Sequence, residues 1–206
     1  MLSRRTALLV PLLLAGCWGG DEEQGFPPLR YDYLAPLRLN VAAIQVEQRF
    51  MPSGVPPDVT QSAPVPPLVA LRAMAEDRLQ TLGSNDRAVF VIQNASLTRR
   101  GSRITGNFAV ELDIYNTPTT RAAFAQASVS GTYSGDLDDL PARLYDLTKN
   151  LMDRMNVEFE YQARRSLGSW LLSAGAPQAP VQQQPLTQGP LQQPPPMQRP
   201  LVPQSP

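Results

Sequence analysis

The chain has no histidine among its 206 residues and only one cysteine, Cys17. The lack of histidine excludes catalytic groups that use an imidazole and metal sites that histidine ligates. One cysteine forms neither an intrachain disulfide nor a thiolate metal cage. Lysine is as rare as cysteine: the chain has one lysine, Lys149, and 17 arginines. The 18 basic and 18 acidic residues balance, which argues against a nucleic-acid partner. We therefore predict no catalytic residues, no metal and no cofactor.

The first 17 residues have the composition of a bacterial export signal. Arg4 and Arg5 form a basic start, and residues 7–14 form an apolar run. This run is too short for a membrane-spanning helix, which needs ~20 residues, but it fits the core of a signal peptide. The missing remainder of a twin-arginine motif favours the general secretory route. We predict a signal peptide over residues 1–16.

Residues 14–17 read Leu-Ala-Gly-Cys and resemble the lipobox of bacterial lipoproteins. The resemblance implies that Cys17 is diacylated on sulfur, becomes the mature N-terminus and is acylated on its amine. The alternative is an ordinary secretory signal with a chance cysteine. An aspartate after the cysteine favours inner-membrane retention in that family, so Trp18 favours the periplasmic face of the outer membrane. Each buried CH2 of the acyl chains would add about 0.8 kcal/mol to the anchoring.

Both ends of the mature chain are poor in core-forming residues. Residues 17–36 are rich in glycine, proline and acidic side chains, which predicts a flexible tether with a reach of roughly 25 Å. Residues 173–206 are predicted to be a disordered tail, because ten of the last 30 residues are proline and nine are glutamine. The folded domain is therefore expected over residues 37–172.

Hydrophobic periodicity in this domain predicts an α+β two-layer sandwich in the order β-α-β-β-β-α. Its sheet is four-stranded and mainly antiparallel, with two helices on one face. Residues 51–67 contain six prolines and no periodic pattern, and a loop this long is unusual unless it is functional or mobile. The expected elements are a strand over 37–50 with a bulge near 41–43, a helix over 66–82 with Gly83 as its C-cap, strands over 88–92, 108–114 and 123–130, and a helix over 140–172.

The last predicted helix is longer than the strands it would cover. Its length of about 48 Å exceeds that of a ten-residue strand, so its C-terminal half should project or bend. Met152, Val157 and Tyr161 widen the apolar surface of this half. We interpret that surface as a second packing surface or as a partner interface.

The lipobox, the tether and the element order together resemble envelope-transport lipoproteins. Two groups share this plan: the lipoproteins of lipopolysaccharide assembly and the auxiliary lipoproteins of ABC-type transport. Residues 152–161 are also similar to a segment of uncharacterised bacterial lipoproteins. The resemblance implies an envelope protein complex as partner and contact with lipid or lipopolysaccharide.

Two clusters of charged residues are candidate sites. Arg99, Arg100 and Arg103 lie within five residues at an expected hairpin tip, where their guanidinium forks could contact anionic lipid phosphates. The alternative is ordinary surface charge. An acidic cluster precedes the last helix and could hold calcium, but helix N-capping explains it without a metal. The members of that cluster are Asp136, Asp138 and Asp139.

These observations favour a non-enzymatic accessory subunit of an envelope complex over two alternatives. One alternative is a freestanding structural or cell-wall-associated lipoprotein that uses its Pro/Gln-rich tail. The other is a hydrolase that uses carboxylates, but Glu158 and Glu160 point to different helix faces and make a poor acid/base pair.

Overall fold

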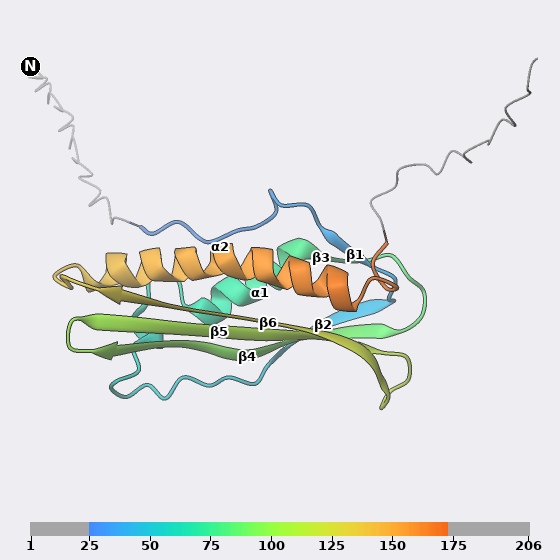
Figure 1. Ribbon diagram of the computed structural model, residues 1–206, viewed down its shortest axis with the longest axis horizontal. Coiled ribbons are helices and arrows are strands. Elements are labelled where there is room, and N and C mark those ends of the chain that lie inside the picture. The colour runs from blue at the N-terminus through green and yellow to red at the C-terminus, as the bar shows by residue number, and fades with distance from the viewer. Residues whose placement is uncertain (1–24, 173–206) are drawn as a thin grey trace, which may run out of the picture. The chain divides into compact units, whose positions relative to one another are not determined.

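The computed structural model describes residues 25–172, so the predicted signal peptide, Cys17 and the Pro/Gln-rich tail lie outside the described residues. Figure 1 shows the elements in order. They are β1 (Leu37–Leu39), β2 (Ala43–Gln48), the 3-10 helix η1 (Thr60–Ser62), α1 (Pro67–Arg78), β3 (Leu79–Thr81), β4 (Arg87–Arg100), β5 (Arg103–Tyr115), β6 (Arg121–Ser134) and α2 (Leu140–Ser166).

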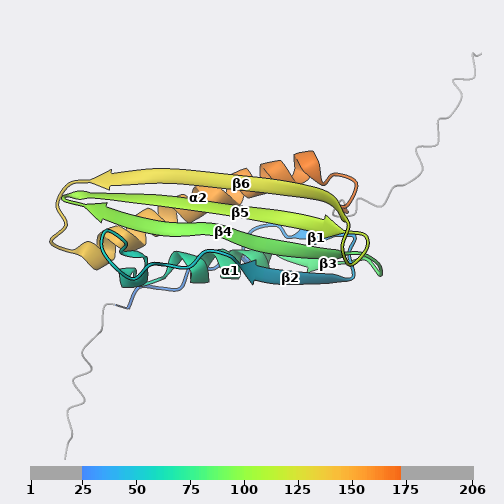
Figure 2. The ribbon, with the colours of Figure 1, turned by 90° about the horizontal axis from the view of Figure 1, so that it is seen from below.

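The predicted α+β two-layer sandwich is confirmed. Strands β2, β4, β5 and β6 form one sheet in that order. β2 pairs parallel with β4, while β4, β5 and β6 form an antiparallel meander. Both helices cover the same face of this sheet, as Figures 1 and 2 show together. We call the other face the helix-free face.

The core forms between the sheet and α2, because the strands have apolar residues at every second position and the helix has them at every third or fourth. The predicted stripe of α2 is buried from Leu144 to Leu167. The ring of Phe90 on β4 meets that of Phe159 on α2 edge to face, with centroids 5.4 Å apart. Gly106 on β5 allows the close approach of α2, because a Cβ there would collide with the Leu151 side chain.

The first predicted strand is divided between two sheets. β1 pairs parallel with β3 in a separate two-stranded sheet, and β2 joins the main sheet. The change of phase near residues 41–43 therefore marks a crossing between sheets, and the predicted bulge there is wrong. The backbone N–H of Ala42 donates to the carbonyl of Asn85, 2.8 Å away, which ties this crossing to the loop before β4.

The first predicted helix ends earlier than expected, at Arg78, and the chain continues directly into β3. Gly83 is therefore not its C-cap. A Cβ at Gly83 would lie 2.5 Å from the backbone nitrogen of Val41, so glycine is required there by a close backbone approach. Leu82, the last residue of the predicted helix, is 58% exposed after β3.

The expectation that α2 projects beyond the sheet is also wrong. Its 27 residues span about 40 Å, while the 14 residues of β4 span about 46 Å. The strands are longer than predicted because polar stretches continue the hydrogen-bonded ladder to the hairpin tip. Met152 is fully buried in the core, whereas Val157 and Tyr161 are exposed.

The packed domain begins before the predicted boundary at residue 37. Leu29 and Tyr31 are buried in the core. The carboxylate of Asp77 on α1 accepts hydrogen bonds from the guanidinium of Arg30 and from the backbone N–H of Tyr31. Residues 25–36, assigned to the tether from their composition, therefore make fixed contacts with α1 through Arg30 and Tyr31.

Candidate anion-contact site at the hairpin tip

The three predicted arginines lie together at one end of the domain, on the turn between β4 and β5. Arg100 pairs with Arg103 across the turn, and all three arginines are exposed. Gly101 adopts a positive φ of 59°, which favours glycine at this position of a tight turn. We call residues 99–103 the hairpin tip.

Two of the arginines belong to a polar surface on the helix-free face. Ile104 and Leu97 are buried on the helix side, so the residues that alternate with them point the other way. A hollow of about 570 Å³ lies there. It is lined by Thr98, Arg100, Gly101, Ser102, Arg103, Thr105 and Ser134.

The hydrogen bonds of the tip arginines go to neutral oxygens. Arg103 Nε donates to Ser134 Oγ at 3.2 Å, and Arg99 Nε donates to the carbonyl of Gly101 at 3.2 Å. Among residues 25–172, no carboxylate forms an ion pair with any tip arginine. Guanidinium groups with hydroxyls beside them offer several donors and no competing anion, an arrangement suited to a phosphate.

In the acidic cluster at the same end, two of the three carboxylates accept hydrogen bonds from backbone N–H groups at or just before the start of α2. Asp139 Oδ1 accepts from the backbone N–H of Ala142 at 3.1 Å, so Asp139 is the N-cap of α2. Asp136 Oδ1 accepts from the backbone N–H of Asp138 at 2.9 Å. Nowhere in the described part of the chain do three or more potential ligand side chains gather as a metal site would require.

The first described residues, 25–27, also lie at this end of the domain. Tyr145, in the second turn of α2, donates from its hydroxyl to the carbonyl of Pro27 at 3.1 Å. Its ring lies 5.1 Å from that of Phe26, centroid to centroid. Gly135, which precedes α2, donates to the carbonyl of Ser102 in the tip. The hairpin tip, the start of α2 and residue 25 therefore share one end of the domain (Figure 1).

The helix-free face contains a buried acidic pair. Glu111 and Asp113 lie on that face, yet they are only 8% and 2% exposed. Arg121 Nη1 contacts both carboxylates at 2.9 Å, and Gln93 donates to Glu111. Burial and the neighbouring Asp113 carboxylate raise the pKa of Glu111 above its usual value. The single arginine offsets one of the two negative charges and links β6 to both carboxylates on β5.

A buried arginine joins the two helices, and the prediction had not identified it. Arg78 is 1% exposed and donates to the carbonyl of Ala35, to Asn156 Oδ1 and to Glu160 Oε2. Burial acts to raise the pKa of Glu160, but hydrogen bonds from Arg164 and Arg78 outweigh it and lower that pKa. Arg78 lies three and four residues after Ala75 and Met74, so the helical period places it on the buried face. This spacing was the signal in the sequence that could have identified it.

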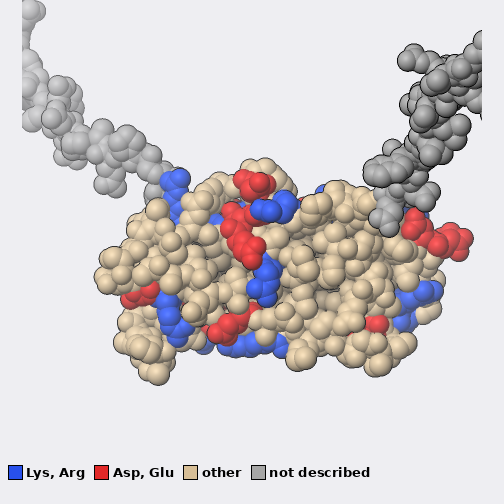
Figure 3. Space-filling view, turned by 180° about the vertical axis from the view of Figure 1, so that it is seen from behind, with Lys and Arg blue, Asp and Glu red and all other residues tan. Residues whose placement is uncertain are grey.

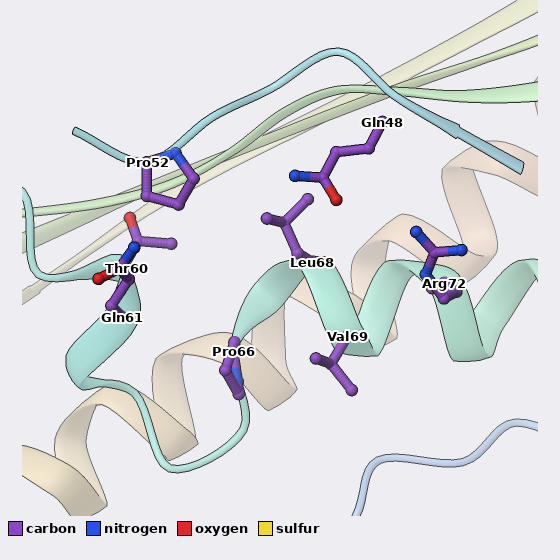
Figure 4. A pocket seen from close by; sticks show the side chains of 8 residues that line it. All are labelled: Gln48, Pro52, Thr60, Gln61, Pro66, Leu68, Val69 and Arg72. Carbon is purple, nitrogen blue, oxygen red and sulfur yellow. The ribbon is translucent and has the colours of Figure 1, made fainter. Parts of the chain in front are cut away.

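The face that carries α1 has two shallow hollows beside the start of that helix. Figure 3 shows charged side chains in a central band and at both ends of this face, with uncharged surface between them. The first hollow, of about 390 Å³, lies between α1 and the chain after β2, and Leu68 points across it toward Gln48 (Figure 4). The second, of about 430 Å³, lies between α1 and residues 26–30. No carboxylate lines either hollow.

No protein-family model matches the sequence, and no curated protein matches it. Three solved structures are similar. A protein assigned as a lipoprotein from Caulobacter crescentus has 12% identity and a TM-score of 0.36, over 59% of this chain and 85% of its own. A minor lipoprotein from Acinetobacter baumannii has 12% identity and a TM-score of 0.33, over 66% and 98%. The PelC dodecamer from Paraburkholderia phytofirmans has 12% identity and a TM-score of 0.24, over 59% and 92%.

The first two of these structures are lipoproteins by name. None of the helices within residues 25–172 is long and apolar enough to span a bilayer. The hairpin tip is the candidate site that the sequence predicts and that the structure brings together.

Proposed function

We propose that this chain is a lipid-anchored lipoprotein on the periplasmic face of the outer membrane, acting without catalysis as an accessory subunit of an envelope complex that handles lipid or lipopolysaccharide. The observation that carries the proposal is the hairpin tip. Arg99, Arg100 and Arg103 have no carboxylate partner among the described residues and lie at the end where residue 25 enters. The lipobox supplies the anchor, and the tip supplies the contact with phosphates.

The length of chain between the anchor and the domain supports this arrangement. Cys17 and Gly25 are eight residues apart, which limits their separation to about 28 Å. A lipid at Cys17 therefore keeps this end of the domain close to one leaflet. The phosphates of anionic headgroups and of lipid A are then the nearest partners for the guanidinium groups.

The contact with an envelope protein is proposed to use the outer side of α2. Val157 and Tyr161 are 73% and 55% exposed, one turn apart on that helix. These two apolar side chains lie next to each other on the helix surface, and a protein interface there would bury both. A pull-down from detergent-solubilised membranes should lose its partner with Val157→Asp and keep it with Leu82→Asp, a change at another exposed apolar residue.

The phosphate contact is tested with a lipid-free chain that carries Cys17→Ala. Replacing the three tip arginines with glutamine should weaken binding to vesicles of phosphatidylethanolamine and phosphatidylglycerol about 100-fold, since each arginine near an anionic surface contributes ~1 kcal/mol. The matched control replaces three exposed arginines elsewhere, Arg49, Arg72 and Arg165. Equal losses in the two variants would contradict a specific role for the tip.

The alternative of a cell-wall-associated lipoprotein makes a separate prediction. Deleting residues 177–206 should leave the set of membrane partners unchanged if the chain is an accessory subunit. Loss of sedimentation with peptidoglycan after this deletion would favour the alternative.

A further inference from the structure

The proline-rich loop after β2 lies along the edge of β4 and reaches the hairpin tip. The N–H of Val59 donates to the carbonyl of Leu97 at 2.9 Å, and the N–H of Arg99 donates to the carbonyl of Pro57 at 2.8 Å. Between these bonds, Asp58 forms an antiparallel bridge with Thr98. The bond from Arg99 to Pro57 therefore joins the segment that carries Val55 to the first residue of the hairpin tip.

Hydrogen bonds to one carboxylate fix the end of this loop. Asp58 Oδ2 accepts from the backbone N–H and the hydroxyl of Ser53, at 2.6 and 3.0 Å. Asp58 Oδ1 accepts from the N–H of Thr60 at 2.8 Å, and the N–H of Asp58 donates to the carbonyl of Val55 at 3.0 Å. Burial acts to raise the pKa of Asp58, but the bonds from Thr60 and Ser53 outweigh it and lower that pKa to about 2. We call residues 53–58 the Val55 turn.

The Val55 turn presents apolar side chains to solvent. Val55 is 61% exposed, and Pro56 and Pro57 after it are exposed as well. Because Val55 is exposed to water, its side chain adds no hydrophobic stabilisation to the folded domain. Exposed apolar residues next to basic ones are the composition with which peripheral proteins enter the headgroup region of an anionic membrane.

We propose that the Val55 turn inserts into the headgroup region of the bilayer while the tip arginines bind phosphates beside it. The occupant of this surface is the anionic lipid leaflet that holds the anchor, because residue 25 enters at the same end and the charge of the tip complements phosphate. This inference rests on the proposed anchoring. It adds the orientation of the domain, which stands with the β4–β5 turn toward the membrane and with residue 172 away from it (Figure 1).

The test places a fluorescent label on the turn of the lipidated full chain. A lipidated Cys17 has no free thiol, so Val55→Cys carries the only reactive one. The chain is labelled with an environment-sensitive dye and reconstituted in vesicles of phosphatidylethanolamine and phosphatidylglycerol that contain brominated acyl chains. The matched control is Leu82→Cys, which is 58% exposed and lies between β3 and the start of β4, whereas the hairpin tip follows the end of β4. Quenching at position 55 with little at position 82 is expected.

The outcomes separate this inference from the function it rests on. A chain that floats with the vesicles while both labels stay unquenched contradicts membrane contact by the Val55 turn and leaves the anchor intact. A chain that fails to float contradicts the anchor and the inference with it. If the turn binds a protein and not the bilayer, the label at position 55 stays unquenched in vesicles of pure lipid, which also overturns the inference.

A second measurement avoids the label. In the lipid-free chain with Cys17→Ala, Val55→Asp should weaken binding to the same vesicles about tenfold, the equivalent of one buried valine side chain. Leu82→Asp should change binding less than twofold. Both variants should keep the circular dichroism spectrum of the parent, since both residues are exposed. Equal binding by the two variants would overturn the inference.

Discussion

Arg78→Met is expected to lower the free energy of unfolding more than any change at an exposed arginine. Arg78 joins residue 35, the end of α1 and the middle of α2 through hydrogen bonds from all three of its guanidinium nitrogens. Methionine keeps most of the volume and removes the donors. The amide oxygen of Asn156 would then lie buried without this partner.

The size of the effect follows from the burial of each partner. Removing one member of a buried ion pair costs about 3–5 kcal/mol, because the other charge stays behind. Glu160 keeps Arg164 as a partner, and its side chain is 33% exposed, so the lower end of that range applies. We expect a loss of about 3 kcal/mol, which for a domain of this size is a fall in Tm of about 9 °C.

The matched control is Arg164→Met, since Arg164 binds the same carboxylate from the solvent side. Its side chain is 57% exposed, and pairs of this kind contribute about 0.5 kcal/mol. Urea denaturation of the lipid-free chain, followed by circular dichroism, measures both variants. The Arg78 effect should shrink as the pH falls below about 4.5, because Glu160 has a lowered pKa in the folded state and stabilises it only when ionised. Similar losses for the two variants would refute the reasoning from burial.

Three further variants test other parts of the fold by the same denaturation assay. Gly106→Val should cost about 1–3 kcal/mol, because its side chain collides with Leu151, and an unchanged stability would mean that α2 lies farther from β5. Asp58→Asn should destabilise at neutral pH, and this difference should vanish as the pH falls from 3.8 toward 2. The parent chain should lose stability as the pH rises above 4.5, since Glu111 binds its proton more tightly when folded, and Glu111→Gln should abolish that loss.

The helices and strands with a regular hydrophobic pattern could be predicted from the sequence, because the residues on one face of such an element share the same kind of surroundings. Strand β5 alternates apolar and polar residues, and α2 carries one apolar stripe, so each pattern specifies a face without knowledge of the partner. The capping of α2 by Asp139 was likewise local and predictable. The hairpin tip could also be predicted, because residues that favour turns surround its arginines.

The missed features all depend on contacts between distant segments. The break between β1 and β2 reads as a bulge in sequence, since only the pairing with β3 or β4 shows that two sheets are involved. The early end of α1 is set by β3, which pairs with β1 some 40 residues before it. The burial of Glu111 and Asp113 requires Arg121, which reaches back over them from the next strand.

The most direct test of the account is mass spectrometry of the N-terminal peptide of the protein purified from membranes. The account predicts a peptide that begins at Cys17, with two acyl chains on the glyceryl thioether and a third on the amine. A free thiol at that position, or a chain that still carries residues 1–16, would contradict it.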